Sequence, residues 1–155
     1  MNEFRGSCHC GNVEFTLFTQ QGVESLVPRR CSCSMCRRHG ASYISDPDAR
    51  LALRYRDRSL LSVYRFGHGT AQWMICSRCG VLTAVLCEIE GRLRAVVRVQ
   101  SMVEHAFPAP EVSTDFESES VAQRLERRAR TWIGTVDVSP PIPSLQAPER
   151  PQPGR

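Results

Sequence analysis

The chain has 155 residues, of which 41% are hydrophobic and 23% charged, and these values suit one globular domain with a hydrophobic core. No apolar run approaches the roughly 20 residues of a membrane helix, and the N-terminal segment lacks the apolar stretch of a secretory signal, so we expect a cytoplasmic protein without membrane contact. The formal net charge of +4 is compatible with nucleic-acid binding, but metal-bound cysteines would lower this charge.

Most of the predicted elements are strands. Apolar side chains alternate in segment 12–17, where Val13, Phe15 and Leu17 share one face of a half-buried strand. Further strands, separated by turns at 46–50, 67–69 and 90–92, are expected over residues 51–55, 60–66, 70–76, 81–89 and 93–99. This succession of short strands predicts a mainly β domain.

One long helix is predicted at about 121–133. Ser120, followed three residues later by Gln123, matches the capping-box pattern, and Gly134 is a natural stop. Helical spacing produces an apolar stripe made of Val121, Leu125, Ala129 and Trp132. We expect a solvated basic face, with nucleic-acid contact as the alternative, from Arg124, Arg127, Arg128 and Arg130.

The segments on either side of this helix differ from the rest of the chain in composition. Residues 107–120 are rich in turn-forming residues and are predicted to be a linker into the helix. Six of the ten prolines lie after Ser139, so residues 138–155 are predicted to be a disordered tail. One domain is therefore expected over residues 1–137.

The eight cysteines are the most informative residues for function. In a reducing compartment clustered cysteines indicate metal sites or catalysis, whereas the alternative, a secreted disulfide scaffold, is usually shorter and follows a signal peptide. Seven of them fall into motifs, while Cys87 lies in an apolar strand and is predicted to be a buried small hydrophobic residue. Seven thiolates and two zinc ions together carry −3, which lowers the net charge from +4 to +1, so we expect no nucleic-acid partner.

Two of the motifs are short turns followed by glycine, with the sequences CHCG and CSRCG. Glycine lets the backbone turn back so that N–H groups point at thiolate sulfurs. Together the motifs supply the four thiolates of a closed, structural zinc site, namely Cys8, Cys10, Cys76 and Cys79. The alternative is that these are ordinary buried cysteines.

The third motif, CSCSMC, contains Cys31, Cys33 and Cys36. Ser34 is expected to cap a short helical turn that ends near Gly40, and the helix N-terminus with nearby arginines favours thiolates. Three protein ligands and an exchangeable fourth position are typical of catalytic zinc. The alternative is a closed site in which His39 supplies the fourth ligand.

The segments GSCHCGNVEF, CSCSMCRRHGA and YRFGHGTAQWMICSRCG occur in this order. With them the chain resembles, over about residues 4–105, the glutathione-dependent formaldehyde-activating enzyme family, which also includes centromere protein V. The resemblance implies a β-tent fold of antiparallel sheets around a structural zinc held by Cys8, Cys10, Cys76 and Cys79. It also implies a second, more labile zinc at Cys31, Cys33 and Cys36.

The resemblance further implies a carbon–sulfur lyase that combines glutathione and formaldehyde reversibly into S-hydroxymethylglutathione. The catalytic site would then be Cys31, Cys33 and Cys36, with the substrate thiol at the fourth position of the second zinc. Arg37 and Arg38 are candidates to pair with the carboxylates of glutathione, with simple exposure to solvent as the alternative. The competing function is a zinc-stabilised binding module without catalytic activity.

Overall fold

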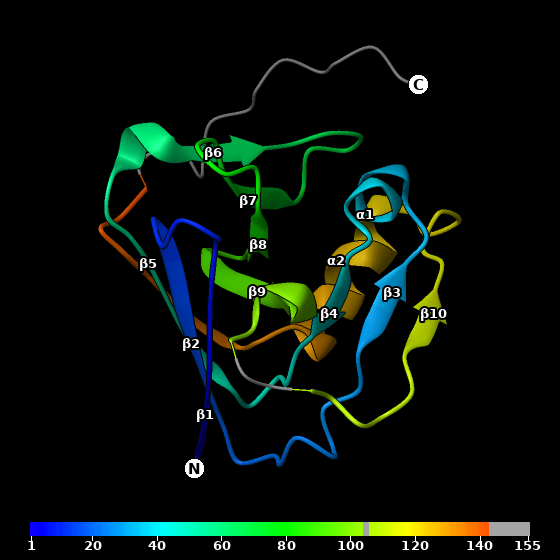
Figure 1. The fold of residues 1–155 in the computed structure, drawn as a ribbon. Coiled ribbons are helices and arrows are strands. Elements are labelled where there is room, and N and C mark those ends of the chain that lie inside the picture. Colours follow the sequence, from blue (N-terminus) through cyan, green and yellow to red (C-terminus); the bar gives the residue numbers. More distant parts are fainter. Residues whose placement is uncertain (104–105, 143–155) are drawn as a thin grey trace.

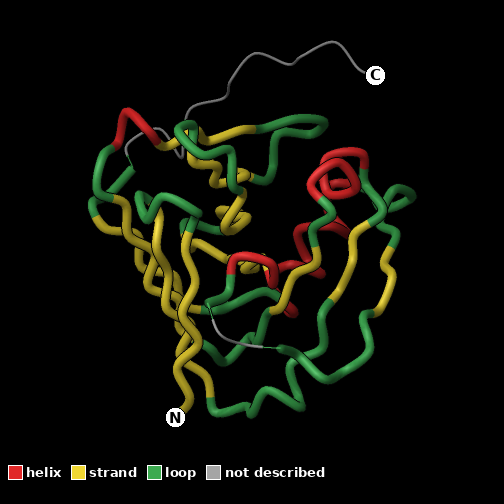
Figure 2. The backbone as a smooth tube through the Cα atoms, in the orientation of Figure 1, coloured by secondary structure: helices red, strands yellow, loops and turns green. Residues whose placement is uncertain are grey.

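The computed structural model describes residues 1–103 and 106–142, which form two β-sheets and two α-helices (Figures 1 and 2). The four-stranded sheet has the order β1 (Asn2–Ser7), β2 (Val13–Thr19), β5 (Arg50–Tyr55), β11 (Thr135–Ser139). The seven-stranded sheet has the order β10 (Val112–Thr114), β3 (Arg29–Cys31), β4 (Ser42–Ile44), β9 (Arg92–Arg98), β8 (Leu82–Ile89), β7 (Gln72–Cys76), β6 (Leu61–Tyr64). The helices are α1 (Ser34–His39) and α2 (Val121–Thr131), with short 3-10 helices at Arg58–Leu60 and Val99–Ser101. Neither α-helix in this part of the chain has the length and apolar content needed to cross a membrane.

The central strands of the seven-stranded sheet contribute buried side chains to two separate cores, one on each face. We call the first the inner core; it lies against the four-stranded sheet and includes Phe15, Leu51, Met74, Leu86 and Val97. We call the second the helix-side core; it lies under α1 and α2 and includes Tyr43, Trp73, Val85, Val96 and Trp132. Figure 1 shows the sheet curving around the two helices. Strand alternation therefore divides the apolar side chains of β7, β8 and β9 between the two cores.

The mainly β fold with a C-terminal helix is confirmed. The strands predicted from alternation at 12–17, 51–55 and 93–99 correspond to β2, β5 and β9, and those at 60–66, 70–76 and 81–89 contain β6, β7 and β8. Five further strands, β1, β3, β4, β10 and β11, were not predicted from the sequence. Two pairings, β10 with β3 and β11 with β5, are parallel, whereas the resemblance implied antiparallel sheets.

Two predicted boundaries are wrong. Residues 112–114 belong to the expected linker but form β10, and Ser32 donates a backbone hydrogen bond of 2.9 Å to Thr114 beside it. The tail was expected to begin at residue 138, but β11 extends to Ser139 and Ile142 is buried in the inner core. The folded part thus extends at least to Ile142, because an apolar side chain in the tail packs back onto the sheet. The remaining tail residues, 143–155, lie outside the described residues.

Helix α2 begins as predicted and ends earlier. The capping box is present, since the Ser120 hydroxyl accepts from the Gln123 backbone N–H and the Gln123 side chain accepts from the Ser120 N–H. The helix ends at Thr131 with Trp132 as its C-cap, so Gly134 is not the stop. Gly134 instead allows a close approach, because a Cβ there would lie 2.3 Å from the Pro47 carbonyl oxygen.

This close approach leads to a testable prediction for Gly134→Ala. The added methyl group must displace the Pro47 backbone, and such overpacking costs roughly 1–3 kcal/mol of unfolding free energy. Urea unfolding followed by circular dichroism measures the loss. Gly22→Ala is the matched control, since its Cβ would meet only the movable carboxylate end of Glu24. Equal stabilities of the two variants would contradict the prediction.

The predicted solvated basic face of α2 is wrong for most of its arginines. Arg128 is buried at 6% exposure, and Arg127 donates two hydrogen bonds of 2.8 and 2.9 Å to the Glu119 carboxylate while its guanidinium stacks 3.5 Å from the Phe116 ring centre. Arg130 remains exposed. The helix lies inside the curved sheet, so more than one of its faces is covered.

Candidate metal centres

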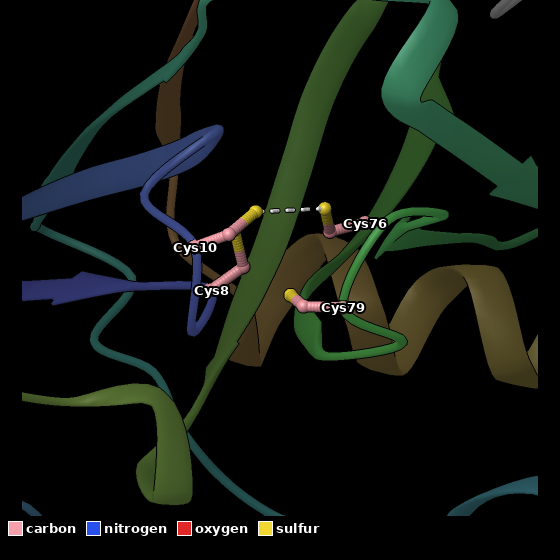
Figure 3. A group of neighbouring side chains, drawn as sticks. All are labelled: Cys8, Cys10, Cys76 and Cys79. Carbon is pink, nitrogen blue, oxygen red and sulfur yellow. Dashed lines mark hydrogen bonds between the residues drawn. The ribbon is translucent and has the colours of Figure 1, made fainter.

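The first cysteine cluster joins two loops that are far apart in the sequence. Cys8 and Cys10 follow β1, Cys76 ends β7 and Cys79 lies in the following turn; Figure 3 shows the four side chains pointing toward one another. All four Sγ atoms lie within 4.8 Å of one another, with 3.7 Å between Cys8 and Cys10 and 3.5 Å between Cys10 and Cys76. Sulfurs around a tetrahedral zinc with Zn–S bonds of about 2.3 Å lie about 3.8 Å apart. The cluster therefore fits a closed zinc site.

Each loop of this cluster is closed by a backbone hydrogen bond from its glycine to the carbonyl of its first cysteine. The N–H of Gly11 donates to the Cys8 carbonyl at 3.1 Å, and that of Gly80 donates to the Cys76 carbonyl at 2.8 Å. Both glycines have φ of +75°, a conformation that other residues rarely adopt. The Val13 N–H also points at the Cys8 sulfur at 3.3 Å. The predicted glycine turns are thus confirmed.

The pKa values of two of these thiols, Cys8 and Cys79, are shifted in opposite directions. Burial raises the pKa of the Cys8 thiol to about 12. Burial acts on Cys79 too, but backbone N–H groups of Cys10 and Val81 and the neighbouring thiols outweigh it and lower the pKa of Cys79 to about 6. A cation bound among the sulfurs would favour the thiolate form of its ligands.

The second cluster is built on the N-terminus of α1. The Sγ atoms of Cys31, Cys33 and Cys36 lie within 4.8 Å of one another. Cys33 is the N-cap, and its sulfur accepts a hydrogen bond from the Cys36 backbone N–H at 3.4 Å. The prediction that Ser34 caps this helix is therefore wrong by one residue. The cap places a cysteine sulfur where helix N–H groups favour negative charge.

Tyr43 is a residue of this site that the sequence analysis missed. Its hydroxyl lies 3.3 Å from the Cys36 sulfur, and the side chain is buried on β4. Burial, and then the neighbouring Cys36, raise the pKa of Tyr43. The hydroxyl therefore stays protonated and can donate a hydrogen bond to a Cys36 thiolate. Hydrogen bonds from Cys31 and Cys36 lower the pKa of Cys33 to about 2. A tyrosine in a short strand carries no local sequence signal for this role.

His39 does not join the second cluster. Within residues 1–103 and 106–142, no histidine, cysteine or carboxylate lies with the three thiols as a fourth ligand. The His39 carbonyl instead accepts a hydrogen bond of 2.9 Å from Arg98, and burial, then the Arg98 charge, lower the pKa of the imidazole. The described residues thus supply three ligands to this site and four to the other.

The remaining candidate residues lie outside both clusters. Arg37 and Arg38 are exposed, and Arg38 donates to the Ser34 carbonyl at 3.0 Å along its own helix. Cys87 is fully buried in the helix-side core, as predicted.

A curved β-sheet that carries a four-thiol cluster on one side and a three-thiol cluster on the other defines a cysteine-rich, mainly β protein suited to two metal ions. The model of the glutathione-dependent formaldehyde-activating enzyme family matches residues 3–117. The chain is also similar to a Rhodobacter sphaeroides protein whose crystal structure comes from structural genomics, with 31% identity and a TM-score of 0.51 over 71% of this chain and 99% of that one. The chain belongs to the glutathione-dependent formaldehyde-activating enzyme family. Helix α2 and strand β11 follow the matched residues.

Proposed function

We propose that this protein is a zinc-dependent carbon–sulfur lyase that forms or cleaves a thiol–aldehyde adduct such as S-hydroxymethylglutathione. The observation that carries the proposal is the contrast between the two clusters. Four thiols close the first site, whereas the described residues supply only three ligands to the second. A site with three protein ligands retains a position for a substrate, which a purely structural site does not need. The family assignment agrees with this reaction class.

In this proposal each cluster holds one zinc ion. Cys8, Cys10, Cys76 and Cys79 hold the structural ion. When bound at Cys31, Cys33 and Cys36, zinc supplies positive charge that favours the thiolate form of a substrate thiol. The protein contributes the helix N-terminus at Cys33 and the Tyr43 hydroxyl that fixes Cys36.

The reaction needs no oxidant or reductant. A bond forms between the thiol sulfur and the aldehyde carbon, the carbon–oxygen double bond becomes single, and the thiol proton ends on that oxygen. Cleavage is the reverse. The helix-side core excludes water from one side of the site, since Tyr43, Trp73 and Trp132 are each less than 10% exposed. We also propose a cytoplasmic location, where thiols such as those of the substrate and of the protein stay reduced.

Exchange NMR with isotope-labelled formaldehyde and glutathione tests the proposal directly. Zinc-loaded protein is expected to accelerate exchange between free formaldehyde and the S-hydroxymethyl adduct above the uncatalysed rate. Other small cellular thiols are tested in parallel, because the substrate thiol is itself part of the proposal. No acceleration with any thiol would overturn the lyase function and favour the binding-module alternative.

Tyr43→Phe tests the role of the tyrosine hydroxyl. Removing the hydrogen bond to Cys36 leaves the aromatic ring in place, and loss of such an outer-shell partner typically lowers metal affinity or activity about 10- to 100-fold. Competition with a chromophoric chelator measures the affinity of the second zinc, and exchange NMR measures the activity. Tyr64→Phe, a half-buried tyrosine on β6, is the control and should change neither. Unchanged zinc affinity and activity in Tyr43→Phe would contradict this role.

A further inference from the structure

The buried guanidinium of Arg128 has no counter-ion in the described part of the chain. The side chain lies in α2 at 6% exposure and makes no ion pair with a carboxylate there. Its Nη1 donates to the Thr70 hydroxyl at 2.9 Å and contacts the Cys87 sulfur at 3.5 Å. Burial raises the pKa of Cys87, so this thiol is neutral and does not balance the charge. A buried charge without a partner is costly, because no opposite charge offsets its desolvation.

The groups around Arg128 increase this excess of positive charge. Arg124 and Arg127 precede it on the same helix, and both oxygens of the nearby Glu119 carboxylate already accept hydrogen bonds from Arg127 Nε and Nη2. The Nε atoms of Arg94, Arg98, Arg124 and Arg128 are all buried without a hydrogen-bond partner. Several donors in this region therefore lack acceptors.

This cationic region adjoins the helix-side core that contains the second cysteine cluster. Arg128 contacts Cys87 and lies over the Trp132 ring at 4.8 Å, and both residues pack in the same core as Cys36. The indole Nε1 of Trp73, another member of this core, is also buried without a partner. The donors without acceptors thus lie on β7, β9 and α2, and two of them, in Trp73 and Arg128, belong to or contact the core that contains Cys36.

The Nη2 group of Arg128 is the donor best placed for an acidic ligand. Within residues 1–103 and 106–142 it has no hydrogen-bond partner, and it is not among the atoms shut off from solvent, whereas Nη1 is engaged and Nε is enclosed. We propose that Arg128 binds a carboxylate of the thiol substrate and so selects acidic thiols over neutral ones. This inference rests on the proposed function for the identity of the ligand. Because α2 follows the residues that the family model matches, the selection would be a property added by the C-terminal segment.

Binding of an unreactive substrate analogue separates this inference from the lyase reaction. S-methylglutathione keeps both carboxylates but has no thiol proton, and its diethyl ester has neither carboxylate. NMR titration of the zinc-loaded protein uses the indole N–H signals of Trp73 and Trp132, the two tryptophans of the chain, as reporters. Arg128→Met is expected to weaken S-methylglutathione binding roughly 10- to 100-fold, the size of a charged hydrogen bond, and to leave ester binding unchanged.

Two further variants control the experiment. Arg128→Lys keeps the charge without the planar fork and should recover part of the affinity. Arg130→Met removes an exposed arginine of the same helix and should bind both analogues like the wild type. The melting temperature of ligand-free Arg128→Met should be unchanged or raised, by up to roughly 2–4 °C, because an unpaired buried charge is removed.

The outcomes distinguish the two proposals. Equal binding of S-methylglutathione by Arg128→Met and wild type overturns the inference, even if the wild type is an active lyase. If Arg128→Met binds both analogues equally more weakly and also has a lower melting temperature, the inference is likewise overturned. Arg128 would then have the role of holding α2 in place. Arg128-dependent binding of S-methylglutathione supports the inference even if no lyase activity is found, in which case only the proposed reaction fails.

Discussion

Replacing Cys76 with serine is expected to abolish the folded state. Cys76 is fully buried at the end of β7, and its sulfur lies 3.5 Å from that of Cys10, so one substitution removes a ligand and opens the link between the two loops. Structural zinc contributes an apparent binding free energy of about 10–16 kcal/mol at neutral pH in zinc-finger peptides. Typical domains have only about 5–15 kcal/mol of stability, so loss of the ion can remove all of it.

Far-ultraviolet circular dichroism and zinc content of the purified protein measure this effect. Cys87→Ala is the matched control, since Cys87 is equally buried but belongs to neither cluster. The control should fold and retain the zinc content of the wild type. A Cys76→Ser variant with native spectrum and full zinc content would show that the first cluster is not the structural site.

Cys33→Ser is expected to give the opposite result, a folded protein without activity. Cys33 is half-exposed at the N-cap of α1, and serine is itself a favourable N-cap, so the helix should form. The substitution removes one of only three thiols at the second site. Metal and charge stabilisation contribute several kcal/mol to such reactions, so the exchange rate should fall at least about 100-fold.

Zinc stoichiometry and exchange NMR on the same sample test this prediction. The zinc content should fall from about two ions per chain to about one, while the circular dichroism spectrum stays native. Ser32→Ala alters an exposed neighbour of the trio and is the control. Retention of both zinc ions or of wild-type activity in Cys33→Ser would rule out the assigned role.

The features that could be predicted from the sequence are those written in local patterns. Alternation identified the longer strands, and the capping box located the start of α2 because its two residues lie within one turn. The cysteine motifs predicted which sulfurs lie together. Short spacings account for the trio and for each half of the four-thiol cluster, whereas the two halves meet by a contact between distant segments. What the thiols bind stays a prediction.

The features that were missed depend on contacts between distant segments. Strands β3, β4 and β10 have three residues each, too few for a period of two to be recognised, and they exist because neighbouring strands pair with them. The roles of Tyr43 and Arg128 arise in the same way. Tyr43 meets Cys36 from another strand, and Arg128 is buried because the curved sheet covers a helix face that composition alone marks as exposed.

The seven-stranded sheet divides the molecule so that the two clusters belong to different cores. One consequence concerns evolution. Under the proposed function, selection on the fold would act on Cys8, Cys10, Cys76 and Cys79, whereas selection on chemistry would act on Cys31, Cys33 and Cys36 and on the helix packed beside them. A descendant that lost the trio would still inherit a stable scaffold, and one that changed α2 could acquire a new substrate without endangering that scaffold. This architecture therefore permits enzymes and non-catalytic relatives to diverge from one ancestor by changes on a single face of one sheet.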